Sequence, residues 1–185
     1  PRTLYWVGGT GNWDDPIHWS LSSGGVSGAC APNASDIVIV DQNSGLSGGA
    51  LTMNVSNASA SVVNFQNAGT NVTVSGDNLS VFNSIYLTQG MSWNLQNLYL
   101  NPTNAGGFIQ TDGTALNYIV VDGTGTIVQN DPTYATQLDL RAGSFDVNGF
   151  DLSASSIHSA PGTNFLSGPV TLTVSNFYIE GTISN

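Results

Sequence analysis

The residues of this sequence that could cleave a polysaccharide are its aspartates, because glycoside hydrolysis uses two carboxyl groups flanking the scissile bond. Asp139, Asp146 and Asp151 lie close together along the chain, and Asp112 and Asp122 precede them. Asp139 and Asp146 could not act on one glycosidic bond if they lay on different faces of the fold. Aspartate also turns corners, and no cluster of His, Arg and carboxylate is evident. We therefore predict that the chain is not an enzyme and has no catalytic residue, cofactor or metal.

The two histidines and the single cysteine offer other reactive groups. His18 lies between Ile17 and Trp19, where we expect a hydrogen-bonded structural residue rather than a base or ligand. His158 ends a short apolar run and is expected to face outward. Cys30 has no basic neighbour in the sequence to lower its pKa, so a catalytic thiol is not expected. One cysteine also excludes an intrachain disulfide.

Aromatic residues are concentrated in residues 4–20, which hold Trp6, Trp13 and Trp19, three of the four tryptophans. Large amphipathic rings of this kind can close the exposed end of a fold. The same rings can stack on the apolar faces of sugars. We predict that the three tryptophans and His18 form either a structural cap or a glycan-stacking platform.

Composition excludes several classes of protein. Asn, Ser, Thr and Gly make up 81 of the 185 residues, whereas lysine is absent and Glu180 is the sole glutamate. A chain so poor in good helix formers is neither a helical bundle nor an ordinary α/β enzyme. With a formal net charge of −10 and only Arg2 and Arg141 as cations, it is not expected to bind nucleic acid or an anionic membrane surface. No apolar run approaches the roughly twenty residues of a membrane helix.

Short runs rich in β-branched or aromatic residues recur from residue 36 onward, and no segment shows a helical period. One series recurs at a nearly constant interval, and its centres are Ile119, Leu138, Ile157 and Phe177. A second series keeps the same interval, and its centres are Ile127, Asp146 and Phe165. The run 182–184 follows the second series, and a third pair is centred on Asp151 and Leu172. Three interleaved series with one period indicate three strands per coil.

This pattern predicts an all-β protein with a single-stranded parallel β-helix of six to seven coils, each about 19–20 residues long. Residues 1–35 would form an aromatic N-terminal cap segment, and residues 36–185 the β-helix, as one domain overall. Asn148–Gly149 and Asp122–Gly123 fall where corners are expected. An antiparallel β-sandwich is the alternative, since it also spaces strands regularly.

The N-terminal segment resembles a family. Residues 5–15 read YWVGGTGNWDD and residues 18–20 read HWS, and a Gly/Ser stretch, Pro32 and the run SDIVIVD at 35–41 follow. This opening resembles that of many phage structural proteins and bacterial surface β-solenoid proteins. The later SFDVNGFDL at 144–152 is similar to the coils of the same group. The resemblance covers both ends of the chain and implies a β-rich virion or cell-surface protein without naming an activity.

From this resemblance we expect a non-enzymatic structural protein on the exterior of a bacteriophage particle, as a capsid decoration, head fibre or tail-fibre component with weak adhesion to host-surface glycans. The absence of a secretory signal from this sequence and a low-charge surface rich in Asn, Ser and Thr favour this location. Removal of an initiator methionine or proteolysis of a longer precursor would each leave Pro1 first, and we expect the former. A bacterial surface adhesin fragment and a polysaccharide-cleaving tailspike-like enzyme are the alternatives. Expected partners are other virion proteins and further copies of the chain, for example in a trimer. Docking is expected at the C-terminal end, with Tyr178 and Ile183.

Overall fold

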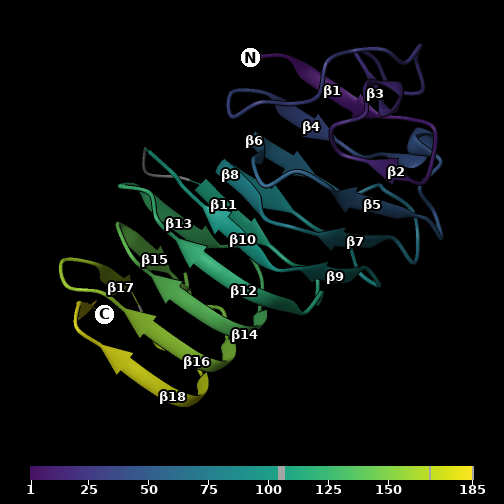
Figure 1. Ribbon diagram of the computed structural model, residues 1–185. Helices are drawn as coiled ribbons and strands as arrows, with labels where there is room; N and C mark the ends of the chain where they lie inside the picture. Colours follow the sequence, from purple (N-terminus) through teal and green to yellow (C-terminus); the bar gives the residue numbers. More distant parts are fainter. Residues whose placement is uncertain (104–106, 167, 185) are drawn as a thin grey trace.

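The chain folds into a β-solenoid in which successive turns stack along one axis (Figure 1). A computed structural model describes residues 1–103, 107–166 and 168–184. It contains about seven turns, and the N- and C-termini lie at opposite ends of the stack. Strand pairs are parallel, apart from β1 (Thr3–Trp6) with β3 (Trp19–Ser20) and one isolated antiparallel bridge among the described residues. The predicted parallel β-helix is therefore confirmed. Asn185, at the end of the predicted β-helix region, lies outside the described residues.

Each turn crosses up to three faces. The first face carries β1, β4 (Ile37–Ile39), β6 (Ala58–Asn64), β8 (Leu79–Tyr86), β11 (Gly107–Gln110), β13 (Thr126–Gln129), β15 (Ser144–Asp146), β17 (Asn164–Leu166) and β19 (Thr182–Ser184). The second face carries the first halves of β6 and β8, then β10 (Asn97–Leu100), β12 (Leu116–Val121), β14 (Thr133–Leu140), β16 (Leu152–Ser159) and β18 (Leu172–Ile179). The third face carries β2 (Gly11–Asn12), β5 (Ala50–Met53), β7 (Thr73–Gly76) and β9 (Ser92–Leu95). Two 3-10 helices, η1 (Pro16–His18) and η2 (Gln42–Ser44), join strands near the N-terminus.

The pairing register follows the period read from the sequence. Ile119, Leu138, Ile157 and Phe177 stand directly opposite one another on β12, β14, β16 and β18. In the other two series the predicted centres are wrong by one residue. Phe145, not Asp146, pairs with Ile127 and Phe165, and Leu152, not Asp151, pairs with Leu172. Side chains alternate along a strand, so this correction turns the apolar residue inward and the carboxylate outward.

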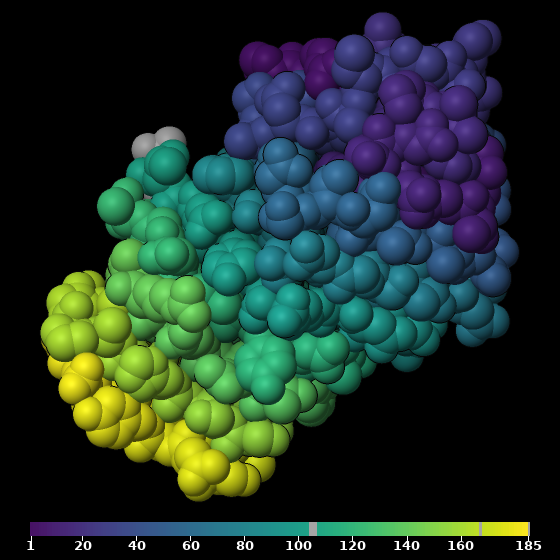
Figure 2. Space-filling model, in the orientation of Figure 1, coloured from purple at the N-terminus to yellow at the C-terminus, as the bar shows by residue number. Residues whose placement is uncertain are grey.

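The inward positions form one continuous apolar core along the axis. A strand in a parallel solenoid pairs with strands of the neighbouring turns rather than with the next strand of a hairpin. Each turn, or rung, therefore depends on the adjacent rungs for both backbone hydrogen bonds and core contacts. In the space-filling view, which is coloured by residue number, the colours follow one another in order from the N-terminal to the C-terminal end (Figure 2). This order is expected when each turn stacks on the previous one. Among the described residues, no helix is long and apolar enough to span a membrane.

Corners between faces depend on glycine for two different reasons. Asn148 and Gly149 adopt φ values of 50° and 80°, as predicted for a corner. Gly123 is needed for a close approach instead, because a Cβ there would overlap the backbone of Pro102 in the neighbouring turn. Gly143 combines both constraints, with φ of 68° and a Cβ position that would overlap the carbonyl oxygens of Gly123 and Gly125.

Replacing Gly143 should therefore cost more stability than replacing a glycine that needs only its positive φ. Gly143→Ala is expected to lower the free energy of unfolding by about 2–4 kcal/mol, the sum of backbone strain and overpacking. Gly149→Ala, where a Cβ would meet nothing within 4 Å, should cost only about 1 kcal/mol. Urea denaturation of both variants measures the difference. Equal losses would contradict the close stacking of these corners.

Candidate functional site

The three N-terminal tryptophans lie inside the protein. Trp6, Trp13 and Trp19 are almost fully buried, and Trp19 packs edge-on against both other rings at centroid distances of 5.0 Å. The indole N–H groups of Trp6 and Trp19 donate to the carbonyl oxygens of Gly9 and Trp13, each at 2.7 Å. Rings this enclosed present no face to a sugar. Of the two predicted roles, they occupy the structural one and close the N-terminal end.

His18 belongs to the same cluster. Its imidazole stacks on Trp6 at 4.7 Å with an interplanar angle of 5°, and Nδ1 lies 2.9 Å from the carbonyl oxygen of Val7. A Cβ at Gly11 would overlap this imidazole, which explains why the motif has glycine immediately before Asn12. The histidine is buried, and its Nδ1 is hydrogen-bonded to Val7. Its contacts are therefore those of a structural residue of the cap, as predicted.

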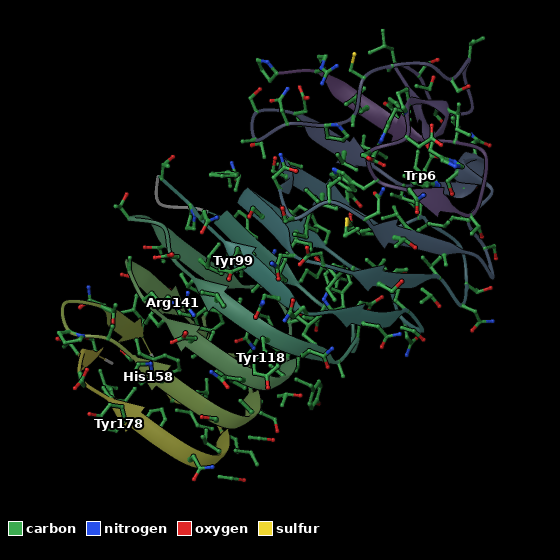
Figure 3. All side chains as sticks on the ribbon, in the orientation of Figure 1. Trp6, Tyr99, Tyr118, Arg141, His158 and Tyr178 are labelled. Carbon is green, nitrogen blue, oxygen red and sulfur yellow. The ribbon has the colours of Figure 1, made fainter. Side chains whose placement is uncertain are left out.

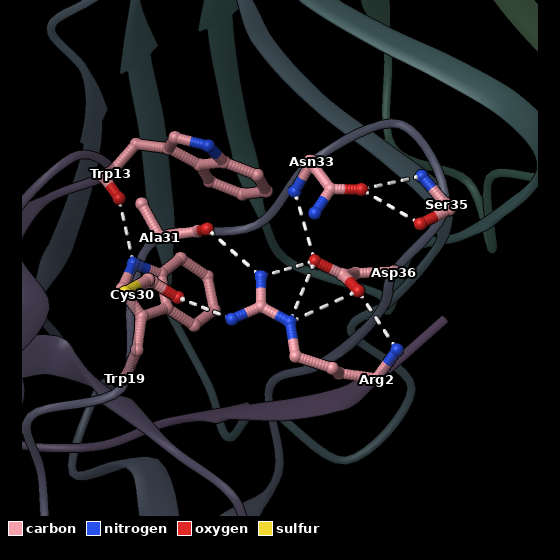
Figure 4. A network of polar contacts seen from close by, with 8 residues as sticks. All are labelled: Arg2, Trp13, Trp19, Cys30, Ala31, Asn33, Ser35 and Asp36. Carbon is pink, nitrogen blue, oxygen red and sulfur yellow. Dashed lines mark hydrogen bonds and ion pairs between the residues drawn. The ribbon is translucent and has the colours of Figure 1, made fainter.

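An ion pair fastens the start of the chain to this cap (Figure 4). The Arg2 guanidinium donates to both carboxylate oxygens of Asp36, and the Arg2 and Asn33 backbone N–H groups donate to the same carboxylate. The guanidinium also reaches the carbonyl oxygens of Cys30 and Ala31. Asp36 is buried, and these hydrogen bonds, the one from Arg2 first, lower its pKa to about 2. Cys30 itself is exposed.

A second polar cluster lies on the outer surface of the second face. The register aligns Tyr99, Val120, Asp139, His158 and Tyr178 across β10, β12, β14, β16 and β18. Figure 3 shows Tyr99, Arg141, His158 and Tyr178 following one another toward the C-terminal end. Arg141 comes just after β14 and lies beside this row.

Asp139 organises this cluster. Its Oδ2 accepts a hydrogen bond from Arg141 Nε at 2.7 Å, and its Oδ1 lies 3.0 Å from His158 Nδ1. His158 in turn stacks on Tyr178, with ring centroids 5.3 Å apart and nearly parallel planes. Because an ionised carboxylate only accepts, Nδ1 of His158 must carry the proton here, which leaves Nε2 of a neutral ring as an acceptor.

The charges of this cluster are mutually compensated. Partial burial acts to raise the pKa of Asp139, but hydrogen bonds from His158 and Arg141 outweigh it and hold that pKa below its ordinary value. The hydrogen bond to Asp139 raises the pKa of Arg141, with smaller contributions from Tyr99 and Asp122. At neutral pH the pair of Asp139 and Arg141 therefore carries no net charge.

Sequence reasoning missed this cluster, and the statement that His, Arg and carboxylate do not cluster is wrong. Asp139, Arg141 and His158 are brought together because residues one turn apart stand side by side. The signal was present in the period, since Asp139 and His158 lie one turn apart in the chain, as do His158 and Tyr178. The outward orientation predicted for His158 is confirmed.

Of the remaining candidate carboxylates, Asp122 lies near Arg141, whereas Asp146 and Asp151 lie elsewhere. Asp139 lies on the second face and Asp146 on the first, so they cannot flank one bond. Asp146 accepts from the Asn148 backbone N–H, and Asp151 accepts from that of Thr171, both as corner residues. Among the described residues, no group of three or more His, Cys, Asp or Glu side chains is placed to hold a metal ion.

The C-terminal end of the solenoid is open. Ile183 stands on β19 in the inward row opposite Phe165, yet it is 48% exposed. Leu172, Val174 and Phe177 line a hollow of about 220 Å³ at the same end. Tyr178, predicted with Ile183 as part of a docking end, lies on the last strand but points outward with His158. The two predicted docking residues thus belong to different surfaces.

The buried Asp36 carboxylate should make the cap sensitive to acid. Its folded pKa lies below the unfolded value, so its contribution is present above about pH 4 and is lost as pH falls toward 2. Asp36→Asn is expected to lower the free energy of unfolding by about 2 kcal/mol at pH 7, with the difference from wild type vanishing near pH 2. Urea denaturation between pH 7 and pH 2 measures this. Asp77→Asn is the control, because the Asp77 carboxylate accepts no hydrogen bond from the described residues, and an equal effect there would contradict the assignment.

The chain has no match among protein-family models, curated proteins or solved structures. Three features of the described structure bear on function: a closed aromatic end, an open apolar end, and a polar cluster exposed on the second face.

Proposed function

We propose that this chain is a non-enzymatic structural protein on the exterior of a bacteriophage particle, as a capsid decoration, head fibre or tail-fibre component, with weak adhesion to host-surface glycans. The resemblance of residues 5–20 to the opening of such proteins supports the location. A stacked parallel ladder whose rungs are joined mostly by short corners suits a protein exposed to proteases and changing salt. Homo-oligomer formation is part of this proposal.

The observation that carries the proposal is the difference between the two ends. At the N-terminal end, β3 covers β1, and Trp6, Trp13 and Trp19 fill the core. At the C-terminal end, β18 and β19 have neighbours on one side only among the described strands. An unpaired edge next to an uncovered core is a surface that proteins ordinarily protect.

We infer that another copy of this chain covers the open end. The strands β18 and β19 contain no charged residue, although the whole chain has a net charge of −10. Glu180, between the two strands, is the charged residue described in this last turn, so two such strand edges can approach with less repulsion than more acidic parts of the surface would produce. Phe177 and Ile183, which are exposed by nearly half, would be buried in that contact. At the N-terminal end, β2 also has a neighbour on one side only among the described strands, but it is just two residues long.

The cluster of Asp139, Arg141 and His158 is the observation that favours the enzymatic alternative. His158 and Arg141 are 41% and 49% exposed on an outer sheet surface. An outer surface open to water stabilises developing charge less well than an enclosed site, and Asp146, the carboxylate considered as a partner of Asp139, lies on another face. These features support binding rather than bond cleavage.

Assembly through the open end predicts a specific effect of Ile183→Asp. We expect the wild-type chain to sediment as an oligomer and this variant as a monomer, because a carboxylate in the contact would be buried without a partner. Ile17→Asp is the matched control, since Ile17 is 60% exposed near the closed end, and it should leave the oligomer intact. A monomeric wild type, or dissociation by both substitutions, would contradict the proposed contact.

The location on a virion predicts where the chain is found. Peptide mass spectrometry should detect it in gradient-purified phage particles, and an antibody against it should label their exterior. Recovery from the surface of uninfected bacteria instead would support the adhesin alternative. Release of reducing ends or unsaturated uronates from host polysaccharide by the purified chain would refute the non-enzymatic assignment.

A further inference from the structure

The outer surface of the second face presents two straight rows of side chains, here called the outer track. Five strands contribute one residue each to both rows, because every strand is in register with the next. The first row consists of Tyr99, Val120, Asp139, His158 and Tyr178, and the second of Asn97, Tyr118, Gln137, Ser156 and Asn176. With neighbouring strands about 4.8 Å apart, four steps make the track about 19 Å long.

The second row has a uniform chemistry. Each of its side chains is an amide or a hydroxyl, and each can both donate and accept a hydrogen bond. Asn97 already uses its Nδ2 to reach Asn78 on the preceding turn at 2.8 Å. A ligand that lies along this row meets neutral donors and acceptors at every rung, which is the complement of a chain of sugar hydroxyls.

Three tyrosines stand on the track, and two of them, Tyr118 and Tyr178, are exposed. Tyr118 is 42% exposed and Tyr178 is 57% exposed, and they lie three rungs apart along the axis. Tyr178 is braced by His158, on which it stacks. Val120 lies between Tyr99 and Asp139 in the first row and is buried, although its row faces outward. Tyr118 and Tyr178 therefore offer the exposed aromatic surface of the track, and His158 covers one face of the Tyr178 ring.

The charges around the track select against an anionic ligand. Arg141 lies beside the track, and the Asp139 carboxylate pairs with it. Asp122 lies near Arg141, and Glu180 accepts the hydrogen bond of the Tyr178 hydroxyl, so the margin of the track is acidic. A uronate or phosphate chain would meet these carboxylates and the net charge of −10. A neutral polysaccharide would not.

We propose that the outer track binds a neutral polysaccharide lengthwise along the solenoid axis, with sugar rings on Tyr118 and Tyr178 and hydroxyls on the second row. This inference rests on the adhesive part of the function proposed above and gives it a site and a ligand class. It is independent of where the chain resides and of how its open end is covered.

Affinity electrophoresis in native gels tests the proposal with defined probes: dextran, mannan, galactomannan and hydroxyethylcellulose as neutral polymers and polygalacturonate as the anionic one. We expect at least one neutral polymer to retard the wild-type chain and polygalacturonate to leave its mobility unchanged. Tyr118→Ala and Tyr178→Ala should each weaken binding, raising the dissociation constant for that polymer about tenfold.

Tyr134→Ala is the matched control. Tyr134 is 48% exposed on β14, but it stands in the row of Ser153 and Thr173, outside the track. The affinity of the Tyr134→Ala variant for the neutral polymer should stay within about twofold of the wild-type value. Tyr118 lies on β12, far from the open end, so its substitution separates glycan binding from assembly. Urea denaturation confirms that each variant is folded.

Each outcome decides a separate claim. If no neutral polymer retards the wild type, both the track and the adhesive part of the function are wrong, whereas detection of the chain on particles still stands or falls by itself. If a neutral polymer binds but Tyr118→Ala and Tyr178→Ala bind as well as Tyr134→Ala, adhesion stands and the track is wrong. Retardation by polygalacturonate alone overturns the neutral ligand class.

Discussion

In-register parallel stacking is the constraint on which the rest of this structure depends. Every strand residue stands over its equivalent in the turns before and after it, so a single side chain acts as part of a column. Inward columns form one continuous apolar core, and outward columns bring side chains from successive turns side by side. The same constraint makes the ends special, because the first and last rungs lack one neighbour. The tryptophan cap and the Arg2–Asp36 ion pair complete the first rung, and no described residue does the same for β18 and β19.

The fold was predictable where the columns are regular. Ile119, Leu138, Ile157 and Phe177 revealed both the period and the true register. The N-terminal half was less predictable because its loops vary: the first-face residues Val38, Val63, Ile85 and Ile109 follow one another at unequal intervals, all longer than the period of the later turns. Loop length changes the spacing without disturbing the stack, since each strand still pairs with the one before it.

The polar cluster of the second face was missed for a related reason. A sequence motif joins residues that are close along the chain, whereas a solenoid assembles its surface sites across turns. Asp139 and His158 lie far apart in sequence but are adjacent in space. The cap was better anticipated because its residues are local, although burial of the three tryptophans required coordinates. Adjacent rings on a short segment are compatible with either an enclosed cluster or an exposed platform.

Stacking also accounts for the unusual composition. A column of identical charges at strand spacing would repel along its length, and no pairing of described strands sets one carboxylate opposite another: Asp139 stands between Val120 and His158, and Asp146 between Val128 and Leu166. Asp131 and Asp151, at corners, instead accept backbone N–H groups from adjacent turns, as Asp131 does for Thr111. Asn, Ser and Thr can repeat in a column without repulsion, and the second row of the outer track is built mainly from such neutral polar side chains. Among the described strands only β14 and β15 contain a carboxylate, Asp139 and Asp146, and the other described carboxylates lie outside strands. This distribution of charge is the one that the proposed binding of a neutral polysaccharide requires.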